Sequence, residues 1–90
     1  MNRYIVLNPL DNVAVATTDL AVDDLILVNG LTIQLVDSIP TGHKFALADL
    51  SVNANIIKYG YPIGHATQGI KQGEHIHTHN IKTNLKDNLQ

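Results

Sequence analysis

The sequence predicts an all-β fold, a compact arrangement of short strands in a single domain. A length of 90 residues suits one domain. Hydrophobic residues make up 44% of the chain, with one Phe and no Trp, so the core should be aliphatic and rich in the β-branched side chains that favour strands. Turn signals separate short apolar runs about every 8–12 residues, which favours a small barrel or convoluted sheet over a parallel sheet with helices. We find no internal repeat.

The expected strands are short apolar segments bounded by Gly, Pro, Asn or Asp. They lie at residues 3–7, 13–16, 25–28, 31–36, 45–50, 56–59 and 74–81. Turns or loops are expected between them, at residues 8–12, 17–24, 38–42, 52–55, 60–62 and 63–70. The segment 82–90 is polar, and we expect it to form a tail. The predicted domain therefore covers residues 1–81.

The clearest local prediction is a hairpin around Asn29 and Gly30. These two residues readily adopt the positive φ angles that a type I′ turn requires, and apolar runs flank them on both sides. Thr32 and Gln34 alternate with apolar neighbours in the second arm. We therefore expect one face of this hairpin to be exposed to water.

Composition excludes several classes of function. The chain has no Cys, which excludes disulfides, thiolate metal sites and cysteine nucleophiles and suits a cytoplasmic protein. No signal peptide is visible, and no apolar run approaches the roughly 20 residues that span a bilayer. The net charge is −2, with six Lys and Arg residues and no basic cluster. We therefore expect neither a nucleic-acid nor a membrane partner.

Histidines cluster in the segment GEHIHTHN at residues 73–80. On a strand, His75, His77 and His79 would share one face and lie roughly 6.5–7 Å apart. Two imidazoles at that spacing can bind one metal ion, whereas three cannot converge without a bend. Direct contact with an anionic substrate and a solvated strand face are the alternatives. A cupin-like site would need a carboxylate shortly after the second His, and none follows until Asp87.

Three other segments carry polar residues beside glycine or a turn. His43 and Lys44 follow Gly42 and could bind a carboxylate, or could simply belong to an exposed loop. Lys58 ends an apolar run before Tyr59 and Gly60, where it could act as a base or anion anchor, or could lie along the strand edge under Tyr59. Asp11 and Asn12 are typical of an Asx turn.

Taken in order, these segments resemble a known family. DNVAVA at residues 11–16, GHKFAL at 42–47, KYG at 58–60 with IG at 63–64, and GEHIHTHN at 73–80 are similar to the amino-terminal domain of the altronate/galactarate dehydratase family. The same SAF-type domain resembles the small subunit of sulfolactate sulfo-lyase. The resemblance covers residues 7–85 and implies a β-clip fold.

The resemblance also implies a function and a set of site residues. It implies a hydro-lyase that removes water from a hydroxylated sugar acid, with a divalent metal, iron or manganese, and a large dehydratase subunit that carries most of the active site. On this basis His77, His79 and Lys58 are the expected catalytic residues, and His77 and His79, with His75 as a further candidate, the metal ligands. The expected substrate contacts are Asn12, His43, Lys44, Tyr59 and Asn80.

Three classes of function remain open at this point. The chain could be the small subunit of a lyase acting on sugar acids or on a sulfonated hydroxy acid. It could instead be a stand-alone module that binds a small anion, or a structural domain that mediates oligomerisation. Exposed strand edges in a small β-domain make a homo-oligomer a reasonable alternative.

Overall fold

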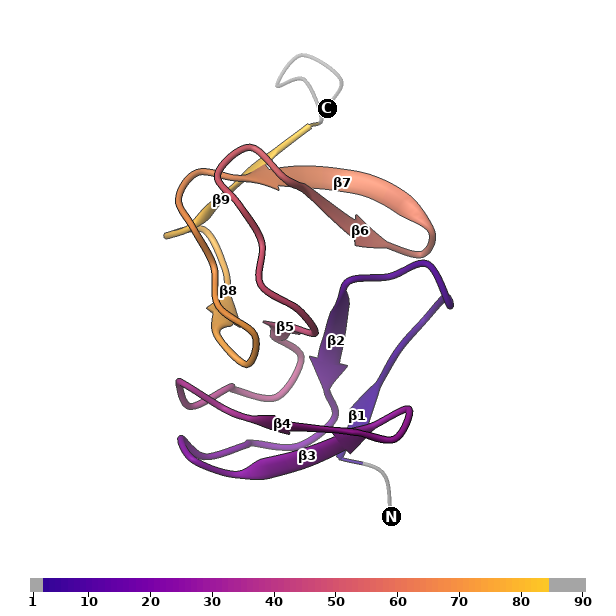
Figure 1. The fold of residues 1–90 in the computed structure, drawn as a ribbon, viewed down its shortest axis with the longest axis vertical. Coiled ribbons are helices and arrows are strands. Elements are labelled where there is room, and N and C mark those ends of the chain that lie inside the picture. Colours follow the sequence, from indigo (N-terminus) through magenta and orange to yellow (C-terminus); the bar gives the residue numbers. More distant parts are fainter. Residues whose placement is uncertain (1–2, 85–90) are drawn as a thin grey trace.

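The computed structural model describes residues 3–84, which contain nine strands and no helix (Figure 1). The strands are β1 (Tyr4–Ile5), β2 (Val13–Ala16), β3 (Leu25–Val28), β4 (Leu31–Gln34), β5 (Lys44–Ala46), β6 (Asn55–Lys58), β7 (Tyr61–Ala66), β8 (His75–Ile76) and β9 (Ile81–Thr83). The prediction of an all-β fold is confirmed. Over the same residues, the chain has no helix long and apolar enough to cross a membrane.

The strands form three small antiparallel sheets. A four-stranded sheet, in the order β1-β2-β5-β8, lies between the β3–β4 hairpin and the sheet β6-β7-β9 (Figure 1). Alternate residues of the central strands enter two different cores. Ala14 and Phe45 pack in the cluster shared with β3 and β4, and Val13 and Ala46 pack in the cluster shared with β6 and β7. Both faces of the central sheet are therefore buried, which explains why β2 is apolar at every position.

The chain contains two equivalent halves, so the expectation of no internal repeat is wrong. Positions 30 or 31 residues apart share a positive φ angle: Asp23 with Asn53, Asn29 with Tyr59, Gly30 with Gly60, and Gly42 with Gly73. The isolated bridge Leu20–Ile39 in the first half likewise corresponds to Leu50–Ile70 in the second. Four of these six pairs are identical, namely Leu20 with Leu50, Gly30 with Gly60, Ile39 with Ile70 and Gly42 with Gly73. At the other two pairs, different residues adopt the same left-handed conformation. The repeat is therefore one of backbone conformation and, at most of these positions, of residue identity.

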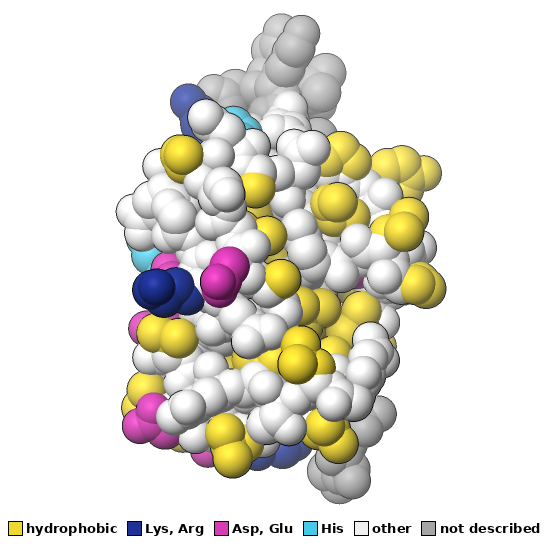
Figure 2. All heavy atoms as spheres, in the orientation of Figure 1, with side chains coloured by type: hydrophobic (Ala, Val, Ile, Leu, Met, Phe, Trp, Pro, Cys, Tyr) yellow, Lys and Arg dark blue, Asp and Glu magenta, His cyan; other side chains and the backbone are white. Residues whose placement is uncertain are grey.

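The β3–β4 hairpin is confirmed at its predicted turn. Asn29 and Gly30 have φ angles of 51° and 80°, as a type I′ turn requires, and Val28 pairs with Leu31. Thr32 and Gln34 are exposed while Ile33 is buried, as the alternation predicts. Apolar side chains nevertheless remain on the molecular surface (Figure 2). Leu25 and Leu27 of β3 are among the exposed residues.

A second hairpin replaces the break expected at residues 60–62. β6 and β7 pair directly, with Lys58 opposite Tyr61, and the turn residue Tyr59 has a φ of 58°. The carboxylate of Asp11 accepts hydrogen bonds from the backbone N–H groups of Tyr59 and Gly60 at 3.1 and 2.8 Å. Because Asp11 is remote in sequence, this turn could not be predicted from local composition.

Other strand boundaries also differ from prediction. The strand expected at 45–50 ends at Ala46, and Leu50 pairs only through an isolated bridge. The first half of the expected loop 63–70 belongs to β7. β9 pairs with β7 through residues 81–83, so the ordered sheet extends two residues into the segment predicted as a tail. Residues 85–90 of that segment lie outside the described residues.

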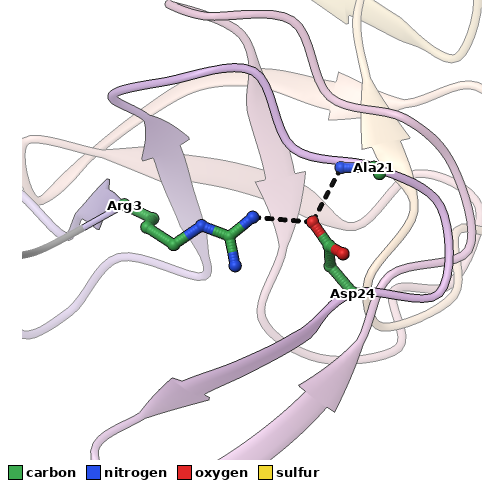
Figure 3. A network of polar contacts seen from close by, with 3 residues as sticks. All are labelled: Arg3, Ala21 and Asp24. Atoms are coloured by element: carbon green, nitrogen blue, oxygen red, sulfur yellow. Dashed lines mark hydrogen bonds and ion pairs between the residues drawn. The ribbon is translucent and has the colours of Figure 1, made fainter.

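A charged contact ties the first described residue to the loop before β3. The Arg3 guanidinium donates to the Asp24 carboxylate at 2.7 Å, and the same oxygen accepts from the backbone N–H of Ala21 at 2.9 Å (Figure 3). Both hydrogen bonds favour the ionised carboxylate and lower the pKa of Asp24, and the bond from the backbone N–H has the larger effect. The contact lies directly before the first residue of β3.

Candidate functional site

Three histidines meet at the edge of the central sheet, where β5 lies beside β8. The pairing of Lys44 with Ile76 and of Phe45 with His75 places His43 opposite His77 when the register is extended by one residue. The ring centroids of His43 and His77 are 4.4 Å apart, and those of His43 and His75 are 5.1 Å apart, in stacked orientations. The site therefore combines two segments that are about thirty residues apart in sequence.

The ring nitrogens of these three residues converge. His43 Nδ1 lies 2.9 Å from His75 Nε2, and one nitrogen from each of His43, His75 and His77 lies within 4.8 Å of the others. His43 and His75 are partly buried, while His77 is exposed. We call His43, His75 and His77 the histidine cluster.

The continuous strand predicted for residues 74–81 is wrong in its middle, since β8 covers only His75–Ile76 and a turn covers His77–Asn80 before β9 begins at Ile81. The turn is built around Asn80, which is fully buried. Its Oδ1 accepts from the backbone N–H of His77 at 3.0 Å, and its Nδ2 donates to the carbonyl of His75 at 2.9 Å and to Glu74 Oε2 at 3.2 Å. Asn80 thus bends the chain and fixes the backbone of two members of the histidine cluster.

Two further contacts hold β8 in place. The backbone N–H of His75 donates to Asp37 Oδ2 at 3.0 Å. Gly73 has a φ of 86°, and a Cβ at this position would lie 2.2 Å from the carbonyl oxygen of Gln34. Only glycine can adopt this conformation at such a close approach without strain, so Gly73 sets the path of the chain into the histidine cluster.

Burial and neighbouring positive charge both favour the neutral form of the imidazoles at the site. Partial burial lowers the pKa of His75, and the neighbouring His43, His79 and His77 lower it further, while the Asp37 carboxylate acts in the opposite direction. Loss of solvent is also the largest cause that lowers the pKa of His77, and the charges of His43, Lys44 and His79 lower it further. Both imidazoles consequently favour the neutral form, which can accept a proton.

Lys44 lies beside the histidine cluster on β5. Burial lowers its pKa, and the charge of Lys58 lowers it further. Lys58, on a different strand, is thus close enough to disfavour the charge of Lys44. An anion placed near them would relieve this repulsion, which makes the neighbourhood suitable for a carboxylate.

The remaining predicted site residues lie in different settings. His79 is exposed, with its ring 5.4 Å from that of His75 and tilted by 34°, and it is not part of the histidine cluster. Lys58 Nζ lies 5.1 Å from the ring centroid of Tyr59, whose side chain is exposed. The alternative of a Lys packed against Tyr59 therefore describes the pair well.

Two predicted substrate contacts use their side-chain amides within the protein. Asn12 Oδ1 accepts from the N–H of Ile57 at 2.8 Å, and its Nδ2 donates to the carbonyl of Asn55 at 2.8 Å. These bonds extend the edge of β6. The fully buried Asn80 is engaged as described above. Both residues position the backbone in this structure.

Sequence reasoning treated His43 and the histidine segment as separate features and did not identify Asp37 at all. The spacing of Gly42 and Gly73 was the available signal, because these glycines occupy equivalent positions in the two halves. His65, the fifth histidine, lies elsewhere, on β7, with its Nδ1 3.1 Å from Asn84 Oδ1.

Comparison with known proteins identifies relatives along almost the whole chain. Residues 2–84 match the altronate/galactarate dehydratase SAF domain. The chain is 49% identical over 85 residues to altronate dehydratase of Escherichia coli (strain K12), covering 94% of this chain and 17% of that protein. It is 46% identical over 87 residues to altronate dehydratase of Bacillus subtilis (strain 168), and the match covers 97% of this chain and 18% of that protein.

A shorter relative matches a smaller part of the chain. The (2R)-sulfolactate sulfo-lyase subunit alpha of Chromohalobacter salexigens is 49% identical over 53 residues, which cover 59% of this chain and 56% of that subunit. The chain thus spans less than a fifth of the length of the altronate dehydratases that it matches.

Proposed function

The chain belongs to the altronate/galactarate dehydratase SAF domain family, and from this membership we propose that it is the small part of a sugar-acid hydro-lyase that works with a larger dehydratase chain. The altronate dehydratases that it matches carry more than four-fifths of their length outside the matched region. In the proposal, that larger part supplies the rest of the active site.

The observation that carries the proposal is the convergence of the histidine cluster beside Lys44. Dehydration of a hydroxy acid needs a base that removes a proton from the carbon next to the carboxylate. It also needs a group that helps the β-hydroxyl to leave. A neutral imidazole can serve as that base, and its conjugate acid can protonate a leaving hydroxyl. The histidine cluster could supply these functions either as free imidazoles or through a metal ion that its three nitrogens hold together.

The cationic side chains have a separate role in the proposal. Lys44 and Lys58 hold the carboxylate of the sugar acid, whose negative charge offsets the burial and the Lys58 repulsion that together lower the pKa of Lys44. Tyr59 and His79 are exposed near Lys58 and His75 respectively, and in the proposal they contact hydroxyl groups of the substrate.

Reconstitution with a large dehydratase chain tests this proposal. The chain and the larger protein would be co-expressed, purified as a complex, and assayed for conversion of altronate and galactarate to 2-keto-3-deoxy acids. We expect His77→Ala and Lys44→Gln to reduce turnover by ~10²–10⁴-fold or to weaken substrate binding. His65→Ala is the matched control, because this histidine lies outside the site. Equal turnover in the site variants, the control and the wild type would contradict the proposal.

A sulfonated hydroxy acid is the second candidate substrate. One observation favours it: the matched region makes up 56% of the sulfo-lyase subunit alpha, against 17% of the E. coli altronate dehydratase. The same reconstituted complex can be given sulfolactate and assayed for released sulfite. Sulfite release without dehydration of sugar acids would select this reaction.

A further inference from the structure

We propose that His43, His75 and His77 together bind one divalent transition metal ion of the type that prefers nitrogen ligands, and that His79 is not a ligand. The inference deepens the proposed function and rests on it for the identity of the site. It differs from the expectation based on sequence, which paired His77 with His79. The deciding feature is the sheet register, which brings His43 opposite His77.

The distances support three ligands around one ion. Imidazole nitrogens bind such ions at about 2.0–2.1 Å, so two nitrogens on the same ion lie roughly 3 Å apart. His43 Nδ1 and His75 Nε2 are already 2.9 Å apart. The third nitrogen, from His77, lies within 4.8 Å of the other two. His77 is exposed, so its side chain can rotate toward them without displacing the core.

Side-chain hydrogen bonds hold the backbone beneath the cluster. Asp37 accepts from the N–H of His75, and Asn80 bonds to the backbone of both His75 and His77. Such supporting bonds orient ligands and raise the affinity of metal sites. His79 has no equivalent anchor among the contacts that fix this turn, and its ring nitrogens are not among those that converge with His43 and His75.

The chemistry of the donors narrows the choice of metal. Three imidazoles suit Fe²⁺, Co²⁺, Ni²⁺ or Zn²⁺, whereas Mg²⁺ and Mn²⁺ prefer carboxylate, carbonyl and water ligands. Of the two metals that the family resemblance implies, the histidine cluster therefore fits iron better than manganese. Three protein ligands would leave open coordination positions, which could take a hydroxyl or carboxylate oxygen of the substrate.

Cobalt binding to the full chain tests the site without any activity measurement. Protein treated with a chelator would be titrated with CoCl₂ and followed by visible absorption and calorimetry. We expect one Co²⁺ per chain and much weaker binding of Mg²⁺ and Mn²⁺. His43→Ala and His77→Ala should each weaken Co²⁺ binding by at least ~10-fold. His79→Ala and His65→Ala should leave it within about twofold, with circular dichroism used to check that every variant is folded.

Three results would overturn the inference. They are absence of Co²⁺ binding by the wild type, equal loss in His79→Ala and His77→Ala, and Mn²⁺ or Mg²⁺ binding as tight as Co²⁺. Because His77 is exposed, its variant should fold even if His43→Ala does not. Sugar-acid binding by the reconstituted complex, measured with chelator present, separates the two proposals. Substrate binding without metal binding would refute only the metal site, and metal binding without substrate binding would refute only the proposed function.

Discussion

Replacing Asn80 with Ala should strongly destabilise the protein and disorder the histidine cluster. Asn80 is fully buried, and its side chain makes three hydrogen bonds, to His77, His75 and Glu74. Each bond contributes about 0.5–1.5 kcal/mol net, and each buried partner left unsatisfied costs more. We therefore expect Asn80→Ala to lower the free energy of unfolding by about 2–4 kcal/mol, which is a large fraction of the total stability of a small domain.

Urea denaturation followed by circular dichroism measures this loss, and thermal unfolding should show a drop in Tm of about 10 °C or more. Asn84→Ala is the matched control, because Asn84 also bonds through its side chain but is exposed at the end of β9. We expect the control to lose about 1 kcal/mol or less. A loss for Asn80→Ala no greater than that of Asn84→Ala would refute the role of Asn80 as the support of the turn.

Three further predictions concern the backbone and the titrating groups. Gly73→Ala should lower the free energy of unfolding by about 2 kcal/mol or more, because φ is positive at this position and the new Cβ would meet the Gln34 carbonyl. Gly69→Ala is the control, because a Cβ there has open space, and it should change the urea midpoint little. His75 has a lowered pKa in the folded chain, so the unfolded chain binds its proton more readily, and stability should fall as the pH drops below about 6.5. Urea midpoints between pH 8 and 5, with chelator present, would show this fall, and His75→Gln should reduce it; a midpoint that rises on acidification would contradict the assignment. Asp24 also has a lowered pKa in the folded chain. Its ionised carboxylate therefore stabilises the fold fully above the pKa of 3.8 that it has when unfolded, and this stabilisation is lost as the pH falls through the lower pKa of the folded state. Asp24→Asn should therefore lose less stability between pH 4 and 2 than the wild type does, and identical acid unfolding curves would argue against the contact in Figure 3.

Local chemistry predicted several elements correctly. Asn29 and Gly30 specify the β3–β4 turn by their own backbone preferences, and β2 and β3 coincide with the expected apolar runs. The prediction failed where a distant residue determines the backbone. Tyr59 adopts a positive φ because Asp11 holds the turn, and residues 77–80 leave the strand because Asn80 reaches back to β8. Propensity within a short window contains no information about such partners.

The sequence by itself determined the all-β class, the main hairpin and the presence of a histidine segment, since these depend on composition, alternation and turn residues. Only the tertiary structure decided which histidines meet. His43 faces His77 because β5 and β8 pair in one register, with Phe45 buried in one core and Ile76 in the other. A slip of one residue would turn every side chain of a strand to the opposite face. The burial of these two apolar side chains thus selects the register, and the register in turn brings the three imidazoles together.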